Sequence, residues 1–223
     1  MVLRLSLVLL LIFVGFIEAE KFFVKETYGN GDVYEGEKEG DAKSGHGSYT
    51  WIDGSSYVGD WVNDAIHGKG VFRYKDGSFY DGSWVNGDRS GFGKYQSSEG
   101  NFYEGYWLKG LVHGEGRLQL VDGELYEGSW VEGEKNGTGE QKYHNGDYYR
   151  GNWVNGAMQG FGWMRFATND EYEGDFWANM RHGRGVYRWA ENGRSFDGYW
   201  SEDVMIAGET RDANGKVLEN LKL

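Results

Sequence analysis

Aromatic and glycine residues alternate with polar residues along most of this chain, in a pattern that returns every 23 residues. With the leading aromatic of each copy as position 1, position 3 is glycine and position 5 is usually tryptophan. Positions 12 and 14 are glycine in seven copies, and positions 16 and 18 are often aromatic. The copies begin at Tyr34, Tyr57, Tyr80, Tyr103, Tyr126, Tyr149, Tyr172 and, one residue late, Phe196. Such fixed-period self-similarity indicates a repeat architecture, in which each unit buries its apolar face against its neighbours.

Within each copy, positions 1–5 and 12–18 alternate with a period of two, which is typical of half-buried β-strands. Asp-Gly or Asn-Gly at positions 20 and 21, as in Asp76-Gly77, predicts a tight hairpin turn, because both central residues of that turn need positive φ. The polar segment from position 6 to position 11 predicts a second, longer turn. The sequence therefore predicts an all-β fold, an elongated single-layer antiparallel meander of hairpins with its aromatic residues on one face.

These columns resemble the MORN repeat (membrane occupation and recognition nexus), whose pattern runs Tyr-Glu-Gly-x-Trp, a polar turn, His-Gly-x-Gly, an aromatic pair and Asp-Gly. Residues 57–79 and 80–102 match it nearly throughout, and the resemblance covers residues 34–208. It implies a twisted sheet with an aromatic groove, which the family uses for scaffolding, for capturing partner helices and, in some members, for contact with lipid. The chain departs from the pattern at Lys38, Thr168-Asn169 and Ala207-Gly208.

The N-terminal segment, residues 1–19, has the features of a signal peptide. Arg4 precedes a 13-residue apolar run from Leu5 to Ile17, and Ala19 supplies the small residue before a cleavage site. Thirteen helical residues span ~20 Å, short of the ~30 Å hydrocarbon core. We therefore expect the secretory pathway, with an extracellular or luminal destination. The alternative is a protein anchored in the membrane by an uncleaved leader.

The repeats are expected to carry caps at both ends. Residues 20–33 fit the second half of a repeat and form an N-terminal half-repeat cap. The eight repeats occupy residues 34–208, the eighth being degenerate, and residues 209–223 form a C-terminal capping tail. In that tail Val217, Leu218, Leu221 and Leu223 have a helix-like spacing and are expected to fold back over the open end of the aromatic face.

The net charge and the absence of cysteine limit the classes of partner and of chemistry that the chain can support. The chain has 23 Lys and Arg against 35 Asp and Glu, a net charge of −12 that loss of residues 1–19 leaves unchanged. Nucleic acid is disfavoured, and so is contact with anionic membrane leaflets unless a local basic patch exists. Because the chain contains no cysteine, it has no thiol nucleophile and no thiolate metal site.

Candidate catalytic and metal-binding residues all have repeat spacing. Histidines at position 11 (His67, His113 and His182) lie two and three repeats apart, ~20 and ~30 Å in the expected sheet, too far to share a metal ion. The position-2 carboxylates form a regular row with ~10 Å between neighbours, which is typical of a solvated face. They are Glu35, Asp81, Glu104, Glu127, Glu173 and Asp197. The Gly-x-Gly pairs lack the other parts of a phosphate loop. We expect no catalytic residue, no cofactor and no metal.

The aromatic face is the strongest functional candidate, because exposed aromatic patches mark interaction sites. We expect a non-catalytic scaffold that binds a helix or peptide of a partner protein in an aromatic groove; the alternative is a membrane-associated adaptor that contacts phospholipid. Tyr80, Tyr103 and Tyr126 are expected to line the groove with their hydroxyls at a wet rim. The position-5 tryptophans are assigned to packing: Trp61, Trp84, Trp107, Trp130, Trp153 and Trp200. Asn136 begins a glycosylation sequon in an expected exposed turn.

Overall fold

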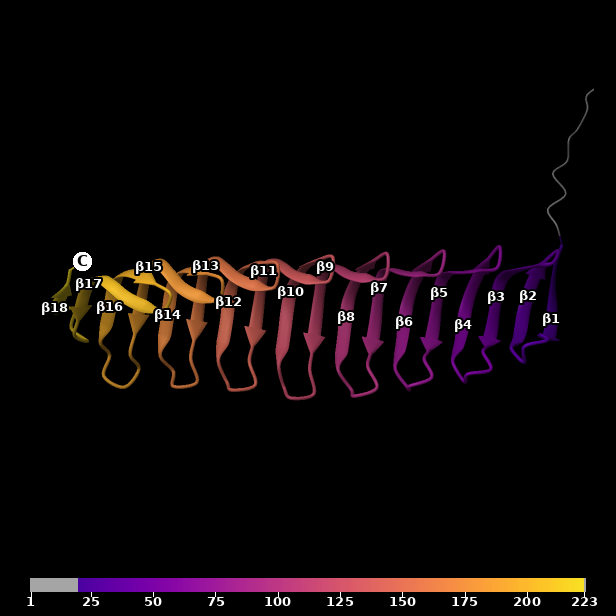
Figure 1. Cartoon of the computed structure of the whole chain (residues 1–223), viewed down its shortest axis with the longest axis horizontal. Coiled ribbons are helices and arrows are strands. Elements are labelled where there is room, and N and C mark those ends of the chain that lie inside the picture. Colours follow the sequence, from indigo (N-terminus) through magenta and orange to yellow (C-terminus); the bar gives the residue numbers. More distant parts are fainter. Residues whose placement is uncertain (1–19, 223) are drawn as a thin grey trace, which may run out of the picture.

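The computed structural model describes residues 20–222, which form one long, single-layer antiparallel sheet (Figure 1). Each strand pairs with the next one in the chain, so the sheet is a meander from β1 to β18. No helix in this part of the chain is long and apolar enough to cross a membrane. The strands are β1 Lys21–Thr27, β2 Val33–Glu39, β3 Ala42–Thr50, β4 Ser56–Val62, β5 Ala65–Arg73, β6 Phe79–Val85, β7 Asp88–Gln96, β8 Phe102–Leu108, β9 Leu111–Gln119, β10 Leu125–Val131, β11 Glu134–Lys142, β12 Tyr148–Val154, β13 Ala157–Arg165, β14 Glu171–Trp177, β15 Met180–Arg188, β16 Ser195–Ser201, β17 Val204–Arg211 and β18 Val217–Leu221.

Each repeat contributes one short and one long strand, as the third repeat shows with β6 and β7. At the N-terminus, β1 pairs with β2 along its whole length and takes the place of the second strand of a missing repeat. The signal-peptide assignment to residues 1–19 lies outside the described residues.

The C-terminal tail does not form the expected helix. Residues 217–221 form β18, which pairs with β17. The connection is a tight turn in which the Gly215 N–H donates to the Asp212 carbonyl at 2.9 Å. The reason is the open edge of β17, whose backbone groups need partners that an extended segment supplies and a helix does not. The tail therefore continues the sheet instead of covering its aromatic face.

The tight turn and the longer turn of each repeat have exchanged places relative to the sequence expectation. Positions 7 and 8 form the tight turn, because Asn86 and Gly87 both have positive φ (50° and 87°) and directly join β6 to β7. In the Asp76-Gly77 pair only the glycine has positive φ, 89°. That pair belongs to a longer loop, residues 74–78, in which the Gly77 N–H donates to the Tyr74 carbonyl at 3.0 Å. An X-Gly pair indicates a turn in both places, but the number of residues with positive φ separates the two types.

The glycines of each repeat have two different roles. In the third repeat Gly82 pairs with Gly93 and Trp84 pairs with Arg89, so β7 carries two extra residues in a bulge. Gly91 lies in that bulge with φ of +69°. Gly93, in contrast, is required for space, because a Cβ there would lie 2.3 Å from the Tyr80 hydroxyl oxygen. The tyrosine ring therefore lies flat on the backbone of the glycine pair.

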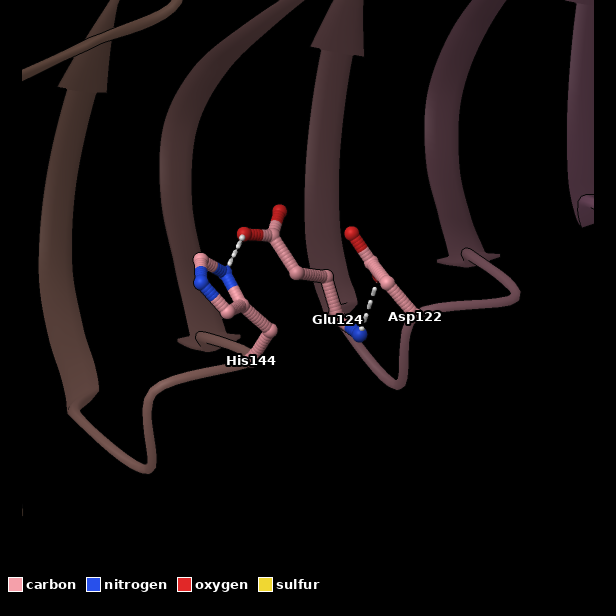
Figure 2. Close-up of side chains that lie close together, drawn as sticks. All are labelled: Asp122, Glu124 and His144. Atoms are coloured by element: carbon pink, nitrogen blue, oxygen red, sulfur yellow. Dashed lines mark hydrogen bonds and ion pairs between the residues drawn. The ribbon is translucent and has the colours of Figure 1, made fainter.

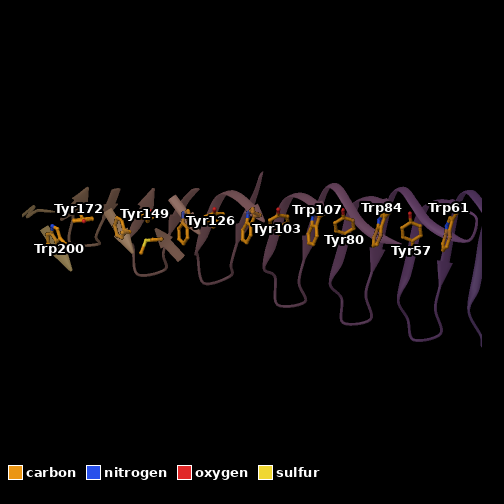
Figure 3. Packing of buried hydrophobic residues seen from close by; sticks show 14 of the residues in the cluster. Tyr57, Trp61, Tyr80, Trp84, Tyr103, Trp107, Tyr126, Tyr149, Tyr172 and Trp200 are labelled. Atoms are coloured by element: carbon orange, nitrogen blue, oxygen red, sulfur yellow. The ribbon is translucent and has the colours of Figure 1, made fainter. Parts of the chain in front are cut away.

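The core is a single file of aromatic rings along the sheet (Figure 3). The Tyr80 ring meets Trp84 of its own repeat edge to face, with centroids 4.9 Å apart, and Trp107 of the next repeat at 5.3 Å. The Trp107 indole N–H donates to the Gly93 carbonyl of the preceding repeat at 3.3 Å. The six position-5 tryptophans are at most 6% exposed, as expected for packing residues. This file joins each repeat to the next.

We expect Gly93→Ala to lower the free energy of unfolding by about 3 kcal/mol or more, because the new methyl group displaces the Tyr80 ring from its slot. The matched control is Gly29→Ala, where a Cβ meets nothing within 4 Å and φ is not positive. That change should alter stability by no more than about 0.5 kcal/mol. Urea titrations followed by circular dichroism compare the two variants, and equal destabilisation would contradict the assigned role of Gly93.

Candidate functional site

The aromatic face has a hollowed section in the fifth to seventh repeats. This section has a volume of ≈ 400 Å³. We call it, together with the partly exposed residues at positions 16 and 18 on the same face, the aromatic groove. Trp153, Met158 and Met164 lie at its floor. The lining is completed by Lys135 of β11, by the loop residues Tyr143, Asn145 and Asp147, and by the hairpin-turn residues Gly156 and Asn179.

The three tyrosines predicted to line the groove do not do so. Tyr80, Tyr103 and Tyr126 are 0%, 3% and 1% exposed. Each hydroxyl donates to the main-chain carbonyl three residues later, as Tyr80 does to Ser83 at 3.1 Å. The expectation of a wet rim is wrong because the glycine pairs leave a slot that each ring fills completely.

The rings that remain partly exposed belong to positions 16 and 18. They flank the buried file on the side of the longer loops, and the tyrosine hydroxyl gives some of them a polar contact. Tyr143, for example, points its hydroxyl at the Met158 sulfur, 3.7 Å away. The half-buried apolar residues of these two columns are Tyr49, Trp51, Phe72, Tyr74, Tyr95, Leu118, Tyr143, Met164, Phe166, Tyr187 and Trp189. The repeat pattern contains these two columns, but the groove lining was predicted at position 1 instead.

Position 10 alternates between a cation and an aliphatic residue along the groove, so this column repeats every two hairpins. The residues are Lys43, Ile66, Arg89, Val112, Lys135, Met158, Arg181 and Met205. Each cation lies over the tryptophan or other position-5 ring of the following repeat, with Arg89 4.2 Å from the Trp107 centroid and Arg181 4.5 Å from that of Trp200.

Most of these cations are also tied to the next hairpin turn. Arg89 donates to the Gly110 carbonyl at 2.9 Å, and Arg181 forms an ion pair with Asp203 at 2.8 Å. Lys135 donates to the Gln141 side chain, and burial lowers its pKa. The position-10 cations therefore cover the tryptophans, and all but Lys135 also brace the next repeat, rather than offering free charges to a ligand.

The opposite face of the sheet is not the plain acidic row expected from position 2. In the third and fourth repeats the position-15 residues are cations that stand opposite the carboxylates of neighbouring strands, so that charges alternate there from strand to strand. We call this row the charged ladder: Asp81, Lys94, Glu104, Arg117 and Glu127. Lys94 and Glu104, for example, lie 3.0 Å apart. The row is solvent-exposed as expected, but its carboxylates face cations.

The position-11 histidines lie within strands and not in the expected turn: His67 in β5, His113 in β9 and His182 in β15. His67 and His113 each accept a long hydrogen bond, 3.4 Å, from a main-chain N–H of the next repeat's hairpin turn. Asn136 also differs from expectation, because it lies within β11 and not in an exposed turn. Its side chain is half-buried beside Asn155, with 3.5 Å between the Asn136 Nδ2 and Asn155 Oδ1 atoms.

One group of metal-type ligands occurs within residues 20–222, in the loops of the fourth and fifth repeats (Figure 2). The donor atoms of Asp122, Glu124 and His144 all lie within 4.8 Å of one another. The His144 Nδ1 atom is 3.2 Å from Glu124, whose other oxygen accepts from Gln141 at 3.4 Å.

Other repeats show what this group does. In the fifth and sixth repeats an acid at the same position as Glu124 holds the next loop. Asp147 accepts the Ala167 N–H and Asp170 the Ala190 N–H, each at 2.8 Å. Glu124 and His144 replace that backbone contact by a side-chain contact. The group is exposed or half-buried, and its contacts hold two neighbouring loops together.

Seven consecutive segments match the family model described as the MORN repeat: residues 34–56, 57–79, 80–102, 103–124, 126–148, 149–171 and 172–194. The chain therefore belongs to the MORN-repeat family. The eighth copy, which is not matched, still forms the hairpin of β16 and β17. No curated protein sequence matches the chain.

Among solved structures, the chain is similar to the TCP10 domain of Danio rerio CPAP, with 13% identity and a TM-score of 0.44. That match covers 90% of this chain and 100% of the other. It is also similar to the TCP domain of Drosophila melanogaster SAS-4 (dCPAP), solved in complex with a proline-rich motif of Ana2 (dSTIL). In this case the identity is 14% and the TM-score 0.41, with coverage of 87% of this chain and 96% of the other.

We expect the sheet to unfold between about pH 10 and about pH 12. Burial raises the pKa of Tyr80 to about 12, and it raises the pKa of Tyr103 and Tyr126 as well. The unfolded chain then loses its tyrosine protons first, near pH 10, so the stabilising contribution is complete below pH 10 and is lost as the pH rises toward 12. Each buried tyrosine lowers stability by up to about 1.4 kcal/mol per pH unit in this range.

The measurement is tyrosinate absorbance followed together with circular dichroism during an alkaline titration. The two signals should change together. The control is Tyr80→Phe, which should move the transition to higher pH; phenylalanine is compatible with this slot because Phe196 occupies it in the last repeat. Tyrosinate absorbance that rises near pH 10 while the sheet stays intact would contradict the burial argument.

Proposed function

We propose that this chain is a non-catalytic scaffold that holds a segment of a partner protein in its aromatic groove. One observation carries the proposal: the rings at positions 16 and 18 stay partly exposed along the face, and no other element within residues 20–222 covers them. Contiguous exposed aromatic surface of this kind marks protein interaction sites. A single-layer sheet has no second layer with which to bury it.

The geometry favours recognition by side chains. The backbone groups of the internal strands already pair with both neighbours, so along the groove a partner gains its contacts from rings and methionines. Trp153, Met158 and Met164 offer an apolar floor, and the Tyr143 ring with Asn145 offers a wall that is partly polar. An amphipathic helix or an extended peptide that lays an apolar edge on this floor has the matching chemistry. Aromatic and methionine side chains are the residues enriched at such interfaces.

We also propose that the chain enters the secretory pathway and is cleaved between Ala19 and Glu20. The charge, length and small residue of segment 1–19 support this, and β1 begins only at Lys21, so cleavage leaves the sheet intact. N-terminal sequencing of protein made in a secreting cell should begin at Glu20. Protein that retains Met1 would refute cleavage.

The groove is tested by replacing two of its exposed rings. We expect the double variant Tyr74→Ser and Tyr143→Ser to lose capture of the partner by about tenfold or more, because rings of this kind act as anchors. The matched control is Tyr106→Ser with Tyr199→Ser, the same chemical change on the opposite face at side chains that are 52% and 56% exposed.

The readout is a quantitative pull-down with each protein as bait, from the compartment where the chain resides. A specific partner is retained by the wild type and by the opposite-face control and is lost from the groove variant. Melting curves of all three proteins show whether the sheet is intact. A groove variant that is folded and retains the same proteins as the wild type would disprove the groove as the binding site.

A further inference from the structure

The charge alternation of the charged ladder ends at Glu127. On β10 and β11, Glu127 stands directly opposite Glu140 in the strand register. Like charges directly opposite one another destabilise a sheet. A second acidic pair, Asp197 opposite Glu209, occurs on β16 and β17, but there each carboxylate has an arginine partner.

Glu140 interacts with the Tyr148 hydroxyl and lies 3.7 Å from the Arg150 guanidinium. Within residues 20–222 the Glu127 carboxylate has neither a hydrogen-bond nor an ion-pair partner, although Arg117 is its neighbour in the register.

The same place is hollowed. A groove of ≈ 900 Å³ runs here across β9 to β14 on the face opposite the aromatic groove. We call it the acidic groove. Its charged lining consists of four glutamates and a single arginine: Glu115, Glu127, Glu140, Glu173 and Arg150. The remaining lining residues include Asn152, Phe161 and Trp163.

Aromatic side chains lie beside these carboxylates. Trp163 takes the position in the row where a charged residue stands in the third and fourth repeats, between Arg150 and Glu173 in the register. Its ring contacts Tyr148, with centroids 5.8 Å apart. Phe161 leaves 57% of its surface exposed. The acidic groove thus combines an excess of negative charge, including the unpaired Glu127 carboxylate, with aromatic surface.

We propose that the acidic groove is a second binding site, and that it takes a basic segment of a partner protein with two adjacent cationic side chains. One guanidinium placed between Glu127 and Glu140 relieves their mutual repulsion and gives each carboxylate a charged donor. The next cationic side chain meets the face of Trp163, where cation–π attraction adds to the contact. Charge complementarity selects this occupant, because an anionic ligand would face the four glutamates. The site does not depend on the aromatic groove, which lies on the other face of the sheet.

The experiment measures the binding of a fluorescein-labelled peptide with two adjacent arginines between leucines to the full chain, by fluorescence anisotropy. A peptide with glutamines in place of the arginines is measured in parallel. We expect the double variant Glu127→Gln and Glu140→Gln to weaken binding of the arginine peptide about tenfold or more, and Trp163→Ser about threefold or more. Raising the salt from about 20 to about 150 mM should also weaken it.

The matched control removes the same charge from the regular part of the ladder. Asp81→Asn with Glu104→Gln should leave the affinity within about twofold, because these carboxylates already face cations. The groove variant Tyr74→Ser with Tyr143→Ser should also bind the peptide normally, which separates this site from the one proposed above.

Several results would overturn the proposal. Equal weakening by the two acid-to-amide double variants would indicate general attraction to a chain of net charge −12. No binding of the arginine peptide by the wild type, or equal binding of the glutamine peptide, would show that the groove does not recognise a basic segment.

Discussion

The seating of a tyrosine ring on a pair of glycines is the contact on which this structure depends. A single-layer sheet has no opposing sheet or helix, so its core has to form on its own backbone. In the third repeat Gly82 and Gly93 expose bare main chain, and the Tyr80 ring lies on it. Trp107 then closes the gap to the next hairpin and donates its indole proton to Gly93. Burial, hydrogen bonding and the link between repeats thus come from one group of residues.

This contact also explains why the two faces differ. The columns of Tyr, Gly and Trp, which are nearly the same in every copy of the repeat, form the core. The residues left for recognition are therefore those that vary between copies. On the aromatic face these are positions 16 and 18, and on the other face they are positions 2 and 15. The regular columns provide the scaffold. Residues that depart from the charged ladder, such as Trp163 and Glu140, distinguish one section of the sheet from another.

The column pattern was sufficient to predict the meander, the aromatic face and the packing role of residues such as Trp107. It was not sufficient to place Tyr80, because a tyrosine at a wet rim and one seated on glycines have the same two-residue periodicity. Asn86-Gly87 and Asp76-Gly77 both indicate turns, and only the backbone conformation shows which is the tight one. The contact between Glu127 and Glu140 depends on strand register, which brings positions 2 and 15 together although they lie far apart within the repeat.

Consecutive strand pairing has a mechanical consequence. Hydrogen bonds in an antiparallel ladder run perpendicular to the strands, and in this sheet that direction is the long axis of the molecule (Figure 1). A tensile force applied to the two ends therefore loads the strand pairs in series and peels them apart one at a time. Each freed repeat of 23 residues can lengthen to ~80 Å at ~3.5 Å per residue. Under tension the protein is thus an extensible tether that yields one hairpin at a time, and not a strut that breaks at once.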